Sequence, residues 1–180
     1  MNAPARRRGP REPWRPSPRS KWSASSAGCE RGGPGESEAP VRRESREKVF
    51  QTLFMMDALG VGPDAAIPLF ELASDPPSDA DYYAEAVRGV WDRIGEIDSL
   101  IGEAAEHWRV ERMTLVDRNI LRLGAYELSL GSDIPFAVAI NEAVELGKRF
   151  GSEESGAFIN GILDRISDIA RKKTTAEGSA

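Results

Sequence analysis

Three arginines, Arg42, Arg43 and Arg46, stand where the first hydrophobic helical repeat of the sequence begins. A guanidinium group binds phosphate through paired hydrogen bonds and stacks on unpaired bases. At the start of a helix an exposed cation meets the positive end of the macrodipole, at a cost of ~0.3–1 kcal/mol. A docked phosphate would reverse that cost, because the free N–H groups of the first turn attract it too. The position of the arginines would thus be explained by a bound anion. Their spacing alone, however, favours the simpler interpretation of a solvated helix end without a ligand.

Side chains that could carry covalent or metal chemistry are scarce. Cys29 and His107 are the only cysteine and the only histidine, and they lie far apart in the sequence. Nucleophilic catalysis needs a nucleophile beside a base, and a cysteine metal site needs several cysteines. The sequence has neither of the glycine-rich phosphate loops G-x-x-x-x-G-K-[ST] and G-x-G-x-x-G. We therefore expect no enzyme, no metal and no cofactor.

The charge of the chain is unevenly distributed. Its net charge is −5, yet residues 1–40 hold eight Lys/Arg against four Asp/Glu, and residues 41–180 hold sixteen against twenty-five. An acidic body does not bind nucleic acid over its whole surface, so a polyanion site must be a local basic patch. Glu44 and Glu47 also interrupt the arginines, which predicts weak binding by this patch alone.

Residues 1–40 lack hydrophobic periodicity and are rich in Pro, Gly, Ser and Arg. Such a segment buries too little apolar surface to fold, so we expect a disordered basic tail. The tail could add non-specific RNA affinity. Alternatively, Val41 is the true start, read from a GTG codon, and the tail is not part of the natural protein. Mass spectrometry of the natural N-terminus distinguishes these two interpretations.

Apolar residues recur at intervals of three and four throughout residues 41–170, which predicts one helical domain. The expected helices cover residues 42–58, 64–73, 79–106, 114–130, 135–150 and those from 152 onward. No segment alternates as a β-strand would. We expect an all-α fold, a compact bundle of about six or seven helices. Residues 171–180 are expected to form a disordered C-terminal tail.

Two local features concern how these helices begin and pack. Thr114 and Asp117 have the spacing of a helix-capping pair. Gly89, Gly95 and Gly102 weaken the helix over residues 79–106, so we expect them to permit close approach of neighbouring helices.

Several polar residues lie within otherwise apolar helical stretches. Buried polar groups need partners, so we expect Asn141, Glu142 and Asn160 to fix contacts between helices. Arg118 and Glu127 are candidates for an internal ion pair.

The C-terminal half, residues 112–166, closely resembles the NusB family. The matching segments are "DRNILRLGAYEL" (117–128), "DIP" (133–135), "AINEA" (139–143) and "FINGILD" (158–164). The arginines of the first helix, followed by "Q-x-L-F" (51–54), are similar to the family's N-terminal arginine-rich motif. The resemblance covers about residues 42–168 and leaves the tail out.

The resemblance implies two small, packed helical subdomains and a role in transcription antitermination. It implies binding of boxA RNA in ribosomal RNA transcripts, in partnership with NusE, a small-subunit ribosomal protein. Other Nus factors and RNA polymerase would complete the assembly. No apolar run is long enough to span a bilayer, and the cytoplasm is the expected compartment.

By the same resemblance, Asp133 and Phe136 lie near the RNA-facing surface beside the arginines. Each has a structural alternative, because Asp133 could cap the following helix and Phe136 could belong to the core. An acid close to RNA repels phosphate, so we expect Asp133→Asn not to weaken RNA binding. The resemblance thus implies an RNA-binding set of Arg42, Arg43, Arg46, Asp133 and Phe136.

Two other functions remain open. NusB-like domains also precede catalytic domains in some ribosomal RNA methyltransferases, but this sequence has no cofactor-binding glycine loop. A helical adaptor that binds only protein is the second alternative.

Overall fold

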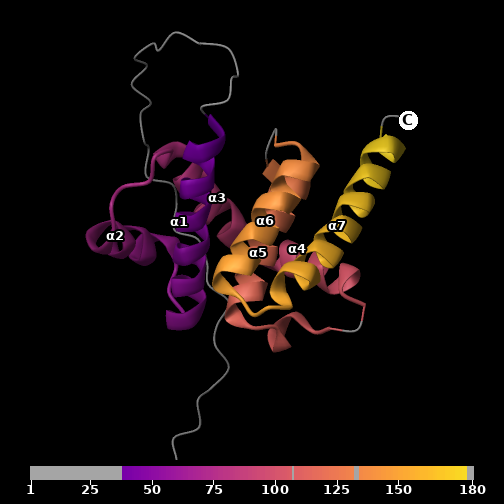
Figure 1. Ribbon diagram of the computed structural model, residues 1–180, viewed down its shortest axis with the longest axis horizontal. Helices are drawn as coiled ribbons and strands as arrows, with labels where there is room; N and C mark the ends of the chain where they lie inside the picture. The colour runs from indigo at the N-terminus through magenta and orange to yellow at the C-terminus, as the bar shows by residue number, and fades with distance from the viewer. Residues whose placement is uncertain (1–37, 107, 132–133, 178–180) are drawn as a thin grey trace, which may run out of the picture. The chain divides into compact units, whose positions relative to one another are not determined.

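The computed structural model describes residues 38–106, 108–131 and 134–177, all of whose regular elements are helical. Figure 1 shows their arrangement. The elements are α1 (Glu38–Leu59), α2 (Pro63–Ala73), α3 (Ala80–Asp92), α4 (Ile94–Ala104), the 3-10 helix η1 (Val110–Arg112), α5 (Leu115–Tyr126), the π-helix η2 (Glu127–Gly131), α6 (Phe136–Phe150) and α7 (Ser155–Glu177). None of these helices combines the length and the apolar character needed to cross a membrane. The expected all-α fold is confirmed.

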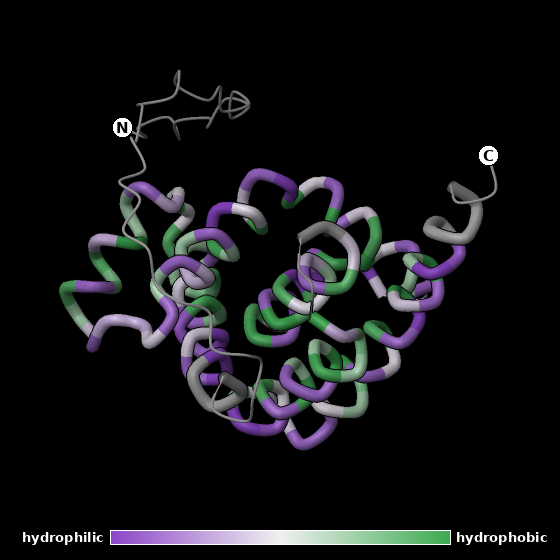
Figure 2. Tube along the Cα trace, turned by 90° about the horizontal axis from the view of Figure 1, so that it is seen from above, coloured by the Kyte–Doolittle hydropathy of each residue, from purple (hydrophilic) through white to green (hydrophobic). Residues whose placement is uncertain are grey.

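Two groups of helices correspond to the expected subdomains. Helices α1, α2 and α3 pack against one another, and α4, α6 and α7 pack around α5. Helix α5 also contacts α1 and α3, so the described residues form one compact unit. Figure 2 shows both hydrophobic and hydrophilic residues along the helices, as expected for amphipathic helices.

Helix α5 is the centre of the core because almost every one of its residues is buried. Its start is fixed by Thr114, whose hydroxyl oxygen accepts a hydrogen bond from the Asp117 N–H at 3.1 Å and donates to the Asp117 carboxylate at 2.8 Å. This confirms the predicted capping pair, which satisfies a backbone donor that has no partner within the helix.

The prediction of one long helix over residues 79–106 is wrong. The chain turns at Arg93, where φ is −114° and ψ is 18°, so α3 and α4 are separate helices. Val90 lies before this turn and Ile97 after it, and both side chains are buried. The apolar repeat therefore continues across the break, which explains why periodicity did not reveal it.

The predicted C-terminal boundary also differs, because α7 continues to Glu177. Residues 171–177, expected in a disordered tail, are helical. The helix keeps a tertiary contact as far as Arg171, whose guanidinium carbon lies 5.3 Å from the ring centroid of Phe136. Residues 1–37 lie outside the described residues, as does most of the expected N-terminal tail. Residues 38–40, expected in that disordered tail, are helical instead, because α1 already begins at Glu38.

The three glycines of the 79–106 segment differ in their surroundings. A Cβ atom at Gly89 would overlap the ring of Tyr126, so this glycine lets α3 approach α5 closely. Gly95 has no heavy atom within 4 Å of such a Cβ, and Gly102 has only ordinary contact. The expectation of close helix approach is confirmed for Gly89 alone.

Candidate nucleic-acid interface

Arg43 is an exposed cation in the second turn of α1, because this helix begins at Glu38 and not at the expected residue 42. Its Nη2 donates to Oε1 of Glu142 on α6 at 2.8 Å, and its Nε donates to Oε2 at 3.0 Å. The Arg43 side chain remains 61% exposed although Glu142 is only 16% exposed. The hydrogen bonds and charge of Glu142 raise the pKa of Arg43, so the guanidinium stays charged. A two-point pair thus holds one edge of the guanidinium and leaves the rest facing solvent.

Arg46 occupies a different environment, inside the helical body. Its Nε donates to both carboxylate oxygens of Glu127, at 2.9 and 3.2 Å, and both side chains are almost fully buried. The Tyr82 hydroxyl donates to the same carboxylate at 2.6 Å, and the Arg46 guanidinium lies 5.8 Å from the centroid of the Tyr82 ring. Arg46 therefore ties α1 to η2 and α3, and its guanidinium is not presented to a ligand.

The groups of this buried cluster shift one another's pKa values. Burial raises the pKa of Glu127, and the charge of Arg46 and the Tyr82 hydroxyl oppose that rise. Burial and the neighbouring carboxylate also raise the pKa of Tyr82, which keeps its hydroxyl protonated as a donor. The cluster needs all three groups, because each supplies the partner that another would otherwise lack.

Two other predicted RNA-binding residues, Arg42 and Phe136, lie at the same end of the bundle. Arg42, half-buried, precedes Arg43 in the first turns of α1. Phe136 is the first residue of α6, is half-buried, and packs against the core. Asp133 lies outside the described residues. In Figure 1 the first turns of α1 and α6 lie at the same end as the last turns of α7.

A second polar network, less buried than the Arg46–Glu127 cluster, joins three helices. One oxygen of Asp57 on α1 accepts hydrogen bonds from Arg118, Asn119 and Arg122 of α5 at 2.8–3.0 Å. Arg122 also binds Asp98 of α4 through two hydrogen bonds of 2.8 Å. Although burial acts to raise the pKa of Asp57, these partners hold it below its ordinary value.

The polar residues expected to fix helix contacts fall into two groups. Glu142 joins α6 to α1 through Arg43, as expected. Arg118 and Glu127 each form an interhelical ion pair, but with residues of α1 and not with each other. The expectation is wrong for Asn141 and Asn160, which are exposed. Asn160 only donates to Asp164 one turn later on α7, at 2.8 Å.

Sequence reasoning missed the contacts that two further residues make with these elements. Arg149, near the end of α6, forms an ion pair with Glu47 of α1 and lies 5.0 Å from the Phe150 ring centroid. Tyr82 completes the buried cluster around Glu127. Neither had a detectable signal, since each depends on contacts between residues far apart in the sequence.

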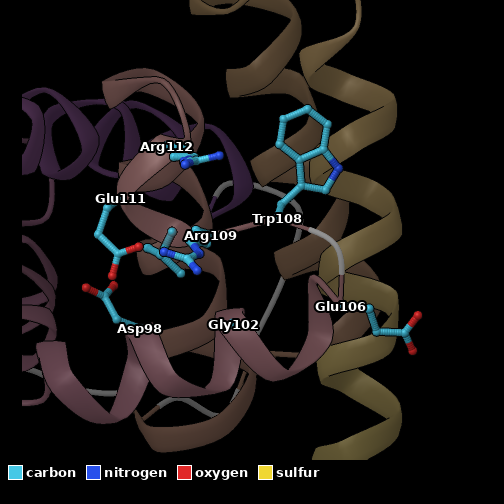
Figure 3. A pocket seen from close by; sticks show the side chains of 8 residues that line it. Asp98, Gly102, Glu106, Trp108, Arg109, Glu111 and Arg112 are labelled. Atoms are coloured by element: carbon cyan, nitrogen blue, oxygen red, sulfur yellow. The ribbon is translucent and has the colours of Figure 1, made fainter.

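A hollow of about 750 Å³ lies between α4 and the segment containing η1. Figure 3 shows its lining side chains, with Glu106 pointing away from the others. The lining residues are Asp98, Gly102, Glu106, Trp108, Arg109, Val110, Glu111 and Arg112. Asp98 already holds Arg122, and within the described residues no group of three His, Cys, Asp or Glu side chains could hold a metal ion.

Arg43 and Arg46 of α1, the ion pair of Arg43 with α6 and the α5 core all fall within one family match. The NusB family model matches residues 43–168. The chain belongs to the NusB family. The resemblance recognised in the sequence is thereby confirmed.

Curated NusB proteins match most of the chain. The transcription antitermination protein NusB of Desulfatibacillum aliphaticivorans is 44% identical over 137 residues, covering 76% of this chain and 96% of that protein. The NusB of Sorangium cellulosum is 47% identical over 130 residues, covering 71% and 92%.

Solved NusB structures share the fold. T. maritima NusB matches with a TM-score of 0.64 and 38% identity, covering 71% of this chain and 90% of that one. A structure of the antitermination factors NusB and NusE in complex with dsRNA matches with a TM-score of 0.65 and 28% identity, covering 72% and 98%.

Proposed function

We propose that this protein is a transcription antitermination factor that binds boxA RNA of ribosomal RNA transcripts together with NusE. It acts without catalysis, in the cytoplasm, alongside other Nus factors and RNA polymerase. Family membership supports this proposal, as does a fold shared with a NusB that was solved with NusE and RNA.

The observation that carries the proposal is the geometry of Arg43. A guanidinium has five N–H donors, and Glu142 occupies one edge of this one. The remaining donors and the planar face are exposed, so a phosphate can bind in the plane or a base can stack on the face. Because Glu142 fixes its orientation, Arg43 loses less conformational freedom on binding than an unrestrained arginine would.

The other two arginines have unequal roles in this proposal. Arg42 is partly exposed and supplies a second positive charge at the same helix end. Arg46 acts as a positioning residue, because its buried pair with Glu127 fixes the first turns of α1 on the bundle. We therefore assign RNA contact to Arg42 and Arg43 and support of that contact to Arg46.

NusE supplies further positive charge for RNA binding, because the basic patch of this chain has few cations. Exposed acidic residues on α3 and α4 would complement a basic ribosomal protein, and complementary charge speeds and orients association. These residues are Asp81, Glu85, Asp92, Glu96 and Glu103. A complex of both proteins would then present RNA with a larger cationic surface than this chain alone.

The proposal is tested by titrating a boxA RNA and a scrambled RNA of equal length, with and without NusE. Preferential binding of boxA, strengthened by NusE, is the expected result. Binding of NusE without RNA preference would instead indicate a protein-only adaptor. Methyl transfer to ribosomal RNA by the chain, alone or with its partners, would indicate the methyltransferase-associated module.

A further inference from the structure

Helix α2 presents an apolar face to solvent. At 100° per residue, the residues on the outer side of this helix are all nonpolar, and each of them is exposed. Leu72 is 86% exposed and Leu69 is 47% exposed, so both belong to the large hydrophobic residues that the described part of the chain leaves in solvent. The outer face consists of Ala65, Pro68, Leu69, Leu72 and Ala73.

The opposite face of α2 attaches this helix to the core. Ala66 is fully buried, and Ile67 and Phe70 pack against the core. Helix α2 packs against α1 and α3, and Figure 1 shows it at the edge of the bundle. A helix that is apolar on both sides is normally covered on both sides. Single exposed hydrophobic residues need no explanation, but a contiguous apolar row bordered by polar residues marks a site of interaction.

The surroundings of this outer face are acidic. Residues 49–87 contain seven Asp and Glu residues and neither Lys nor Arg. Asp64 and Glu71 lie two turns apart on one flank of the outer face, and Asp75 follows the helix; all three are exposed. Arg88 of α3 pairs with Asp64 at 2.8 Å, but this is one surface pair and the flank stays acidic. An occupant with Lys or Arg beside its apolar residues would therefore be attracted and oriented by the flank.

The size and charge of this face argue against a second copy of the chain as its occupant. A face of this kind exposes on the order of a few hundred Å². A stable interface buries roughly 800 Å² on each partner. Two copies would also bring the acidic flanks of both α2 helices together, and like charges in contact disfavour association. The outer face of α2 is therefore better suited to one short apolar segment of a basic protein.

Building on the proposed function, we propose that the outer face of α2 docks a basic protein of the transcription assembly. Leu69 and Leu72 insert between apolar side chains of that partner, and the acidic flank with Glu71 attracts the Lys or Arg residues that border them. This docking surface shares no residue with the RNA-binding arginines of α1. The chain can therefore hold RNA and this protein at the same time.

The experiment measures the affinity of the full chain for purified NusE, the other Nus factors and RNA polymerase, each in turn. It compares the wild type with the double variant Leu69→Ser, Leu72→Ser and with Leu72→Ser alone, which alters the more exposed leucine. Val138→Ser is a matched control, because Val138 is 44% exposed on α6. We expect a basic component to bind the double variant at least about tenfold more weakly than the wild type. We expect Val138→Ser to bind that component as the wild type does.

Further readings separate this inference from the proposed function. Thermal melts report the folding of each variant, and boxA affinity should stay at the wild-type value because neither leucine belongs to the RNA-binding set. Glu71→Gln should make binding of the basic component less sensitive to salt, since it removes one screened charge. The inference is overturned if no component binds the wild type, if the folded leucine variants bind every component as the wild type does, or if they lose only self-association. Absence of a boxA preference in the wild type would instead refute the proposed function.

Discussion

The Arg46 guanidinium and the Glu127 carboxylate form a buried ion pair that joins α1 to η2, with Nε 2.9 Å from Oε1. Only 4% and 2% of the two side chains are exposed. Arg43, three residues earlier, instead pairs at the surface. Two arginines one helical turn apart thus serve different purposes, one supporting the helix and one facing solvent.

Replacing Arg46 by Met should destabilise the protein by about 3–5 kcal/mol, because the buried Glu127 carboxylate would lose the positive charge and hydrogen bonds of Arg46. Urea unfolding at neutral pH measures this change. The double variant Arg46→Met, Glu127→Leu removes both charges and should recover most of the loss. A single variant as stable as the wild type would contradict the assigned role of the pair.

The same variant should depend on pH in a defined direction. Burial raises the pKa of Glu127 in the folded protein. A carboxylate of this kind makes the folded state less stable as the pH rises from its unfolded-state pKa toward its raised folded-state pKa. Without Arg46 the pKa rises further. Arg46→Met should therefore lose more stability than the wild type as the pH rises above the ordinary pKa of a glutamate. Parallel stability curves for the two proteins would contradict this prediction.

Asp57→Asn tests the network that joins α1, α4 and α5. We expect a loss of about 1–3 kcal/mol at pH 7, because three donors of α5 lose a charged acceptor. The folded protein holds the pKa of Asp57 below its ordinary value. The ionised Asp57 therefore stabilises the fold fully at pH values above the ordinary pKa, and this stabilisation is lost as the pH falls through the lowered folded-state pKa. The difference between wild type and variant should shrink in acid.

Asp64→Asn is the control for this network, since the Asp64 side chain is 85% exposed in its pair with Arg88. A surface pair of this kind contributes little, so we expect a change within about 0.5 kcal/mol. Equal losses of unfolding free energy in the Asp57 and Asp64 variants would show that the network stabilises the fold no more than a surface ion pair does.

Two glycine substitutions should have opposite effects. Gly89→Ala places a methyl group against the buried ring of Tyr126 and should cost about 1–3 kcal/mol through overpacking. Gly95→Ala meets open space within α4 and should stabilise by about 0.5–1 kcal/mol, because alanine has less backbone entropy to lose. Thermal melts distinguish the two, and equal melting temperatures would contradict the packing described here.

The burial of Arg46 had a signal in the sequence. Arg46 lies three residues before Val49 and seven before Leu53, on the stripe that forms the core, and both apolar residues are buried. A helical pattern therefore predicts which face of α1 is buried. It does not identify the partners, because Glu127 and Tyr82 reach Arg46 only through the packing of η2 and α3.

Other features could not be predicted for similar reasons. The break at Arg93 leaves the apolar repeat intact, and the Arg43–Glu142 pair joins residues 99 positions apart. Asn141 and Asn160 lie within apolar stretches of the sequence, which suggested buried positions, yet both are exposed. Short-range rules found the helices and the cap at Thr114, whereas long-range polar contacts required the three-dimensional structure.

The central claim is that exposed cations at the start of α1 bind RNA, and one comparison tests it most directly. BoxA affinity with NusE is measured against salt for the wild type, Arg43→Gln and Arg88→Gln. Arg43 and Arg88 are 61% and 53% exposed, and each pairs with one carboxylate. We predict that Arg43→Gln alone weakens binding and lowers the salt slope by about 0.7. Equal affinities and slopes for all three folded proteins would contradict the claim.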